Sequence, residues 1–187
     1  MRLLIMGPPG AGKGTQALNI AKHFSIPHIS TGDIFRENLK KETPLGIEAK
    51  SYMDKGLYVP DDVTNRIVED RLTWNDVKNG FLLDGYPRTL DQVKFLDSLL
   101  SKFNQKLNYV IELVVEKNLV IERLVKRAQE QNRIDDTKEV IAKRLEVYAT
   151  ETSPLLSEYK NRGLLVQIDG MGTVSEVESR IIKALNN

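Results

Sequence analysis

The chain alternates short, nearly unbroken apolar runs with longer stretches in which apolar residues recur at helical spacing. Runs that lack polar alternation are typical of strands covered on both faces, as in a parallel sheet. The strand pattern occurs at 3–6, 27–29, 81–83, 109–113 and 164–168. Helical stripes are formed by Val63, Ile67, Val68 and Leu72, by Leu90, Val93, Leu96 or Leu99, and Leu100, and by Val174, Val177, Ile181 and Leu185. This alternation of strand and helix patterns predicts an α/β fold built on a parallel sheet.

Two segments depart from this alternation of strands and helices. Residues 30–59 place two helical stretches, separated at Thr43-Pro44, between the second strand and the next core helix. We expect a small helical subdomain with its own hinges there. Residues 127–137 are polar and aperiodic and separate two long helices; their plainest interpretation is an exposed loop, which composition alone does not reject. The predicted single domain then has a core made of 1–29, 60–126 and 138–187.

The first apolar run leads into a glycine-rich stretch, Gly7-Pro-Pro-Gly-Ala-Gly-Lys-Gly-Thr15, which an amphipathic pattern follows as far as Phe24. Strand, glycine-rich turn and helix in this order predict a phosphate-binding loop, because consecutive backbone N–H groups then face an anion at a helix N-terminus. Lys13 adds a positive charge for the outer phosphates. Because Gly14 follows the lysine, the hydroxyl of Thr15 comes one place later than in the G-x-x-x-x-G-K-[ST] pattern.

The composition limits the partners of the protein. Apolar residues make up 41% of the 187 and charged residues 28%, as is usual for a globular domain. The 26 acidic residues nearly cancel the 27 basic ones, so no global basic field would recruit nucleic acid or a membrane. The lack of cysteine excludes disulfides and thiolate metal sites. With no apolar leader and no run of membrane-spanning length, we expect a cytoplasmic protein.

Asp84 ends the third apolar run, so its carboxylate should lie at the edge of the sheet where ligands bind in α/β folds. A nucleoside triphosphate on the loop needs Mg²⁺, and an aspartate in this position would hold the ion directly or through water. Asp84 also opens the sequence Asp-Gly-Tyr-Pro-Arg, a tight turn that would aim Arg88 at a phosphate. Gln92 follows one helical turn later and could face the same ligand. A capping role for Asp84 and a solvated Arg88 are the alternatives.

Further arginines recur at suggestive spacing. Arg123 and Arg127 are four residues apart and share a helix face, Arg133 lies in the polar segment, and Arg144 lies in the helix beyond. Phosphoryl transfer requires positioning and neutralisation of charge on the migrating group, which arginines supply. Surface arginines paired with nearby acidic residues are the alternative, and spacing alone leaves both open.

Taken together, these motifs resemble the adenylate kinase family. The resemblance runs from the first strand to the last helix, and Gly14 after the lysine is what nucleoside monophosphate kinases show. It rests on the glycine-rich stretch, Ser30-Thr31-Gly32-Asp33 with Arg36, Leu57 to Pro60, Asp84 to Arg88 with Gln92, Arg123, Arg127, Arg133-Ile134-Asp135-Asp136 and Arg144.

The resemblance implies a P-loop fold with a five-stranded parallel sheet and two mobile pieces. Residues 30–59 would be the AMP-binding subdomain, and 127–137 would be a lid of the short type. Because the zinc-binding cysteines of some bacterial members are absent, a zinc site is excluded. The segment 128–132 lacks the glycine that short lids usually have, and Tyr58 is bulky where a smaller apolar residue is common.

The resemblance also implies roles for individual residues. Arg123 would lie over the adenine of ATP, Arg36 and Arg88 would hold the phosphate of AMP, and Asp84 would support Mg²⁺ through water. The residues implied for ATP are Gly10, Ala11, Gly12, Lys13, Gly14, Thr15, Arg123, Arg127 and Gly172. Those implied for AMP are Thr31, Arg36, Leu57, Tyr58, Val59, Gly85, Tyr86, Pro87, Arg88, Gln92, Arg133 and Arg144. The catalytic cations would be Lys13, Arg36, Arg88, Arg123, Arg127, Arg133 and Arg144.

The implied activity is reversible, Mg²⁺-dependent transfer of the terminal phosphoryl group of ATP to AMP, giving two ADP, by a protein that is a monomer. A UMP or CMP kinase is the first alternative, but pyrimidine members usually have a small apolar residue where this chain has Thr31. A P-loop switch that binds nucleotide without turnover is the second. Switches of the GTP-binding class carry Asn-Lys-x-Asp, a tetrapeptide that does not occur here.

Overall fold

The structure is a computed structural model that describes residues 1–131 and 137–186, with 127–131 described in backbone only. Within these residues the chain forms one sheet of five parallel strands in the order β2-β3-β1-β4-β5. The predicted α/β fold with a parallel sheet is therefore confirmed. The strands are β1 (Arg2–Met6), β2 (His28–Ser30), β3 (Phe81–Asp84), β4 (Tyr109–Val114) and β5 (Leu165–Asp169).

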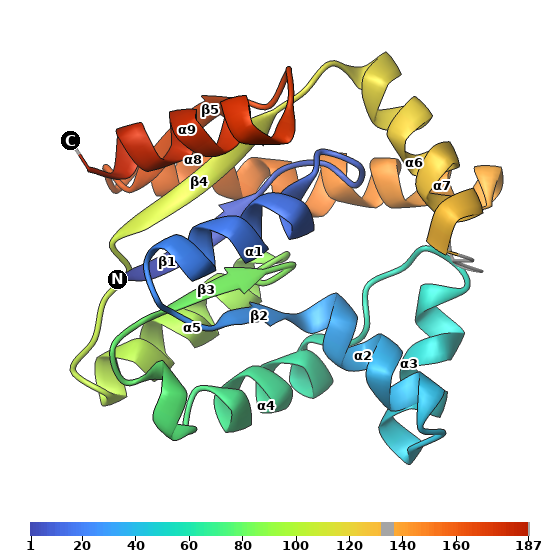
Figure 1. Ribbon diagram of the computed structural model, residues 1–187. Coiled ribbons are helices and arrows are strands. Elements are labelled where there is room, and N and C mark those ends of the chain that lie inside the picture. The colour runs from blue at the N-terminus through green and yellow to red at the C-terminus, as the bar shows by residue number, and fades with distance from the viewer. Residues whose placement is uncertain (132–136, 187) are drawn as a thin grey trace.

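Helices cover both faces of this sheet (Figure 1). The α-helices are α1 (Lys13–His23), α2 (Thr31–Lys40), α3 (Pro44–Met53), α4 (Asp61–Arg71), α5 (Leu90–Lys102), α6 (Lys117–Gln131), α7 (Lys138–Val147), α8 (Ser153–Asn161) and α9 (Val174–Leu185). A 3₁₀ turn, η1 (Asn75–Val77), precedes β3, and a π-helical turn, η2 (Tyr148–Thr152), joins α7 to α8.

The first strand shows why the sheet is buried on both sides. Leu3 and Ile5 pack into one apolar core with side chains of α1 and α9, while Leu4 and Met6 pack into a second core with α4, α5 and α8. Successive side chains of a strand point to opposite faces, so a strand between two helical layers must be apolar at every position. This requirement explains the unbroken apolar runs in the sequence.

Two helix pairs extend beyond the carboxyl ends of the strands. In Figure 1, α2 and α3 lie at the lower right and α6 and α7 at the upper right, while both ends of the chain lie at the left. A small apolar cluster of Phe35, Ala49, Val59 and Val63 holds α2 and α3 against α4. The predicted pair of helices in 30–59, separated at Thr43-Pro44, is thus confirmed, with Thr43 as the N-cap of α3.

Three local expectations were wrong. Leu90 and Val174 were placed in apolar helical stripes, but each is the first residue of its helix, and they are 51% and 49% exposed. The plainest interpretation of 127–137 was an exposed loop, yet α6 continues to Gln131, because Ala128, Gln129 and Glu130 favour helix and no glycine or proline interrupts them. Over the described residues, no helix is both apolar enough and long enough to traverse a lipid bilayer.

The N-cap of α3 gives a test of local stability. The hydroxyl of Thr43 accepts a hydrogen bond from the Gly46 N–H at 3.1 Å and donates one to Asn38 Oδ1 at 2.9 Å. We expect Thr43→Ala to lower the free energy of unfolding by about 1 kcal/mol in urea titrations. The control is Thr43→Ser, which keeps the hydroxyl and should lose less than half as much; an equal loss would argue against capping as the cause.

Candidate active site

The predicted site residues gather around one cavity of about 750 Å³ at the carboxyl edge of the sheet. This volume lies within the usual range for small-molecule sites. Every residue predicted for the site whose side chain the structure describes lines this cavity: Gly10, Ala11, Gly12, Lys13, Gly14, Thr15, Thr31, Arg36, Leu57, Tyr58, Val59, Asp84, Gly85, Tyr86, Pro87, Arg88, Gln92, Arg123, Arg144 and Gly172. The side chain of Arg127 and all of Arg133, Asp135 and Asp136 lie outside the described residues.

The glycine-rich loop leaves the start of α1 open to an anion. The N-cap is Gly12, in the left-handed region at φ 91°, which has no side chain to accept from the first-turn N–H groups. The first turn begins Lys13-Gly14-Thr15, with no carboxylate to take that place. A helix N-terminus of this kind has unsatisfied N–H donors and a partial positive charge, so it favours phosphate.

Close packing against α6 fixes the path of this loop. Gly10 has φ 85°, and a Cβ there would lie 2.7 Å from the Val120 carbonyl oxygen and 2.8 Å from Leu124 Cγ. Any larger residue would have to displace backbone as well as side chain. The loop therefore depends on α6 for its shape, and α6 also carries Arg123.

Lys13 lies within the curve of its own loop. Its Nζ donates to the carbonyl oxygens of Gly7 at 2.7 Å and Pro8 at 2.9 Å. Next to it, a Cβ at Gly14 would lie 3.7 Å from Asp84 Oδ2, so the start of α1 and this carboxylate face each other closely.

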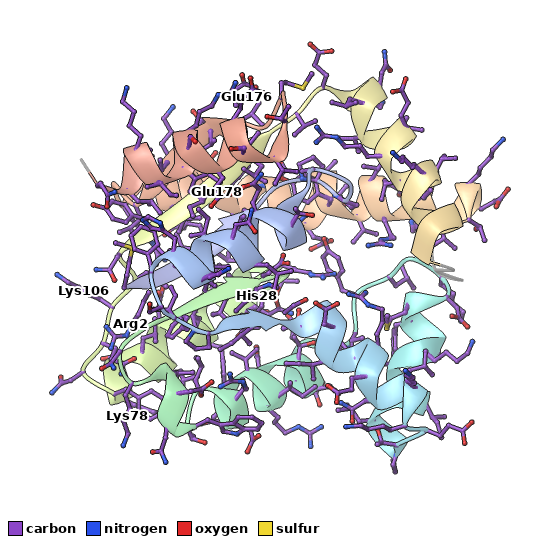
Figure 2. All side chains as sticks on the ribbon, in the orientation of Figure 1. Arg2, His28, Lys78, Lys106, Glu176 and Glu178 are labelled. Carbon is purple, nitrogen blue, oxygen red and sulfur yellow. The ribbon has the colours of Figure 1, made fainter. Side chains whose placement is uncertain are left out.

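Asp84 ends β3, as predicted, and is 8% exposed. Its register partner is Ile5 of β1, which leads into the loop, so the carboxylate and the phosphate-binding N–H groups share one edge. Asp84 Oδ2 also lies 3.5 Å from Nε2 of His28, a residue labelled at the middle of the molecule in Figure 2. Among the side chains that the structure describes, no three His, Asp or Glu residues cluster in a way that could hold a metal ion.

Hydrogen bonds hold both the backbone and the side chain of Arg88 in the turn after Asp84. Gly85 has φ 78°, and its carbonyl oxygen accepts from Arg88 Nε at 2.6 Å and from Thr31 Oγ1 at 2.9 Å. The backbone N–H of Arg88 donates to Gln92 Oε1 at 2.7 Å. The amide of Gln92 also donates to Asp61 Oδ1 at 2.7 Å, so this buried side chain fastens the turn as well as lining the cavity.

The other arginines come from distant segments. Arg36, on α2, forms an ion pair with Asp33. Arg123 donates to the Ala11 carbonyl oxygen at 3.4 Å and to that of Gly170 at 3.5 Å, so it lies between the loop and the β5–α9 connection. Arg144 reaches the cavity from α7. Spacing alone had left surface pairing open for Arg123 and Arg144, and the structure places both at the cavity.

The basic residues at the opposite end of the sheet belong to a separate surface. Figure 2 shows Arg2, Lys78 and Lys106 on the side of the molecule away from α2–α3 and α6–α7. Arg2 donates from Nε to Gln105 Oε1 at 2.8 Å and from Nη2 to the Lys78 carbonyl oxygen at 3.3 Å. The positive charge at the cavity is therefore local, as the near-neutral composition required.

Two further cavity residues, Tyr148 and Thr152 of η2, were not predicted from the sequence. Thr152 is buried, and burial raises the pKa of the Tyr148 phenol well above its usual range. A π-turn has no apolar period of its own. The available signal was Pro154 at the start of α8, because proline has no N–H to donate and so interrupts the regular α-helical hydrogen bonds just before it.

Comparison with known proteins gives consistent results over the whole chain. Residues 5–164 match the family model described as adenylate kinase. An adenylate kinase of Bifidobacterium longum is 57% identical over 185 residues, which cover 99% of this chain and all of that protein. Adenylate kinases of Leifsonia xyli (57% identity, 98% of this chain and 92% of that protein) and of a Nocardioides species (54%, 100% and 97%) are similar over comparable lengths.

Proposed function

Since the chain belongs to the adenylate kinase family, we propose that the cavity at the carboxyl edge of its sheet is where ATP and AMP meet. The activity is reversible transfer of the terminal phosphoryl group of ATP to AMP, which gives two ADP. The observation that carries the assignment of the site is the convergence of Lys13, Arg36, Arg88, Arg123 and Arg144, from separate parts of the chain, on one cavity.

The ATP phosphates would lie on the open N-terminus of α1. The first-turn N–H groups donate there, and Lys13 exchanges its bonds to the Gly7 and Pro8 carbonyl oxygens for bonds to phosphate oxygens. Arg123 would cover the adenine, with Gly172 at its edge. The position of Arg123 between the Ala11 and Gly170 carbonyl oxygens supports this role.

AMP would occupy the part of the cavity lined by 57–59 and by the turn after Asp84. Thr31 and Gln92 would face the adenine, and Arg36 and Arg88 would hold the phosphate. A planar guanidinium suits this task because it donates two parallel hydrogen bonds to phosphate oxygens. Arg127, Arg133 and Arg144 would close on the migrating phosphoryl group, and the charge that they offset there stabilises the transition state.

The residues near Asp84 fit a magnesium ion bound with ATP. Asp84 supplies a carboxylate and Thr15 a hydroxyl, which are the hard oxygen donors that Mg²⁺ prefers, with water completing the coordination. When bound, the ion would offset charge on the phosphate oxygens. The protein's own part is to hold the two nucleotides in line and to exclude water, for which 30–59 and 127–137 would close over the site.

We extend the proposal to a monomer in the cytoplasm. Its support is the family to which the chain belongs.

ATP hydrolysis with and without AMP tests this assignment. Without AMP we expect little release of phosphate, because 30–59 and 127–137 would close over the migrating group only when both nucleotides are bound, and water is otherwise not activated. Adding AMP should give fast formation of two ADP for each ATP consumed. Brisk hydrolysis without AMP would count against the assignment.

A panel of monophosphates serves as the control. We expect kcat/KM to be highest for AMP, since Thr31 and the backbone of 57–59 are the groups proposed to receive adenine. A preference for UMP or CMP would contradict the assigned acceptor site while leaving the phosphate-binding loop unaffected.

A further inference from the structure

Arg88 lies where three segments that are distant in sequence meet. Its guanidinium carbon is 4.8 Å from the centre of the Tyr58 ring, which comes from the connection after α3. Its Nε donates to the Gly85 carbonyl oxygen in its own turn. Its backbone carbonyl oxygen accepts from Thr152 Oγ1 of η2 at 2.9 Å. Two of these three contacts, those to Tyr58 and Thr152, orient this arginine from outside its own turn.

Tyr58 and Thr152 are joined directly by a hydrogen bond of 2.7 Å between their hydroxyl oxygens. A threonine hydroxyl has one proton, and that of Thr152 is donated to the Arg88 carbonyl oxygen. The phenol of Tyr58 must therefore be the donor to Thr152. The bonds form a chain with one direction, from Tyr58 through Thr152 to the backbone of Arg88, and Thr152 is buried within it.

We propose that Tyr58 is a positioning residue for Arg88, acting through its ring on the guanidinium and through Thr152 on the backbone. The inference deepens the proposed function, because it rests on Arg88 as the group that binds the AMP phosphate. A free arginine side chain loses rotamer entropy when it is ordered by a ligand. The ring of Tyr58 on one side and the Gly85 carbonyl oxygen on the other restrict that freedom before AMP arrives.

The same bond links the orientation of Arg88 to the position of 57–59. Gly56, two residues before Tyr58, packs on α7 so closely that a Cβ there would lie 2.9 Å from the Val140 carbonyl oxygen. Thr152 belongs to the turn that follows α7. Tyr58 reaches Thr152 only when the end of the 30–59 segment rests on α7 and η2. It follows that Arg88 has its contacts with both Tyr58 and Thr152 only when residues 57–59 lie against α7 and η2.

Kinetics of three variants test the proposal. Tyr58→Leu removes ring and hydroxyl, and we expect kcat/KM for AMP to fall about 10- to 30-fold while KM for ATP stays within about twofold. Tyr58→Phe and Thr152→Val each remove only the chain of hydroxyl bonds, and each should lower kcat/KM for AMP about three- to fivefold. Combined, these two changes should have no more effect than either alone. Tyr52→Phe, a tyrosine of α3 outside the cavity, is the matched control and should be unchanged.

A double-mutant cycle separates positioning from packing. In an Arg88→Gln background, Tyr58→Leu should lower kcat/KM for AMP by less than about twofold, because the group that it positions is gone. Equal effects in both backgrounds would overturn the proposal, as would a Tyr58→Leu enzyme with unchanged kcat/KM for AMP. A lower melting temperature without a selective change for AMP would also overturn it. Should Tyr58→Leu fail to fold, Tyr58→Phe and Thr152→Val decide. Failure of the unmodified enzyme to phosphorylate AMP would instead refute the proposed function.

Discussion

Replacing Lys13 by methionine should lower kcat by about 10²–10³-fold, measured as ADP formation from Mg·ATP and AMP. The ammonium lies inside the phosphate-binding loop, on the carbonyl oxygens of Gly7 and Pro8, where it can turn to the outer phosphates. Methionine keeps the length and most of the packing of lysine but has no charge to place beside the migrating group. The effect should fall on kcat more than on the KM for AMP.

Lys22→Met is the control for this change. Lys22 lies in the last turn of the same helix, is exposed, and is outside the cavity, so the loss of its charge should leave kcat within about twofold. The circular dichroism of both variants should match that of the unmodified protein. A Lys13→Met enzyme that retained more than a tenth of kcat would contradict the role of Lys13.

Replacing Arg88 by glutamine should lower kcat/KM for AMP by about 10²–10³-fold, with KM for ATP changed little. The guanidinium would make charge-assisted hydrogen bonds to the AMP phosphate, and glutamine offers a single neutral donor group there. Arg88→Lys should recover only a small part of the loss, because an ammonium keeps the charge without the planar pair of donors. Steady-state kinetics with each nucleotide varied in turn separate the two substrates.

A surface arginine provides the comparison for Arg88. Arg66 lies on α4 with an exposed side chain that pairs with Asp62, and Arg66→Gln should have no measurable effect on either KM. An Arg88→Gln enzyme that lost ATP and AMP binding equally would argue that the turn had collapsed rather than that a phosphate contact was lost.

Most of the core could be predicted from the sequence because the physical rule there is simple. Strands buried on both faces must be largely apolar, so β1, β3 and, apart from Glu112, β4 could be recognised, and Asp84 was conspicuous as the carboxylate that ends β3. The glycine-rich loop could be placed for a similar reason, since its chemistry needs a strand before it and a helix after it. Leu90 was misjudged because a helical stripe does not show how its first residue will face.

The contacts around Arg88 could not be predicted in this way. Tyr58 and Thr152 are 94 residues apart, and neither shows by its spacing that it will touch the other. The partners of Gln92 and the approach of His28 to Asp84 are likewise consequences of packing. The roles of the arginines were ambiguous in the sequence, because surface pairing was an open alternative. Local pattern identified the candidate residues, and only the tertiary structure showed which of them lie at the same cavity.

The uncapped start of α1 has a thermodynamic consequence for the whole molecule. A phosphate group bound there would accept hydrogen bonds from the first-turn N–H groups, as the side chain of a serine or aspartate N-cap does in other helices. The substrate would therefore act as the N-cap of α1. A ligand that binds only the native state adds about 2.7 kcal/mol to its stability at a concentration one hundred times its dissociation constant. The free energy of unfolding of this enzyme should therefore rise with the concentration of adenine nucleotides around it.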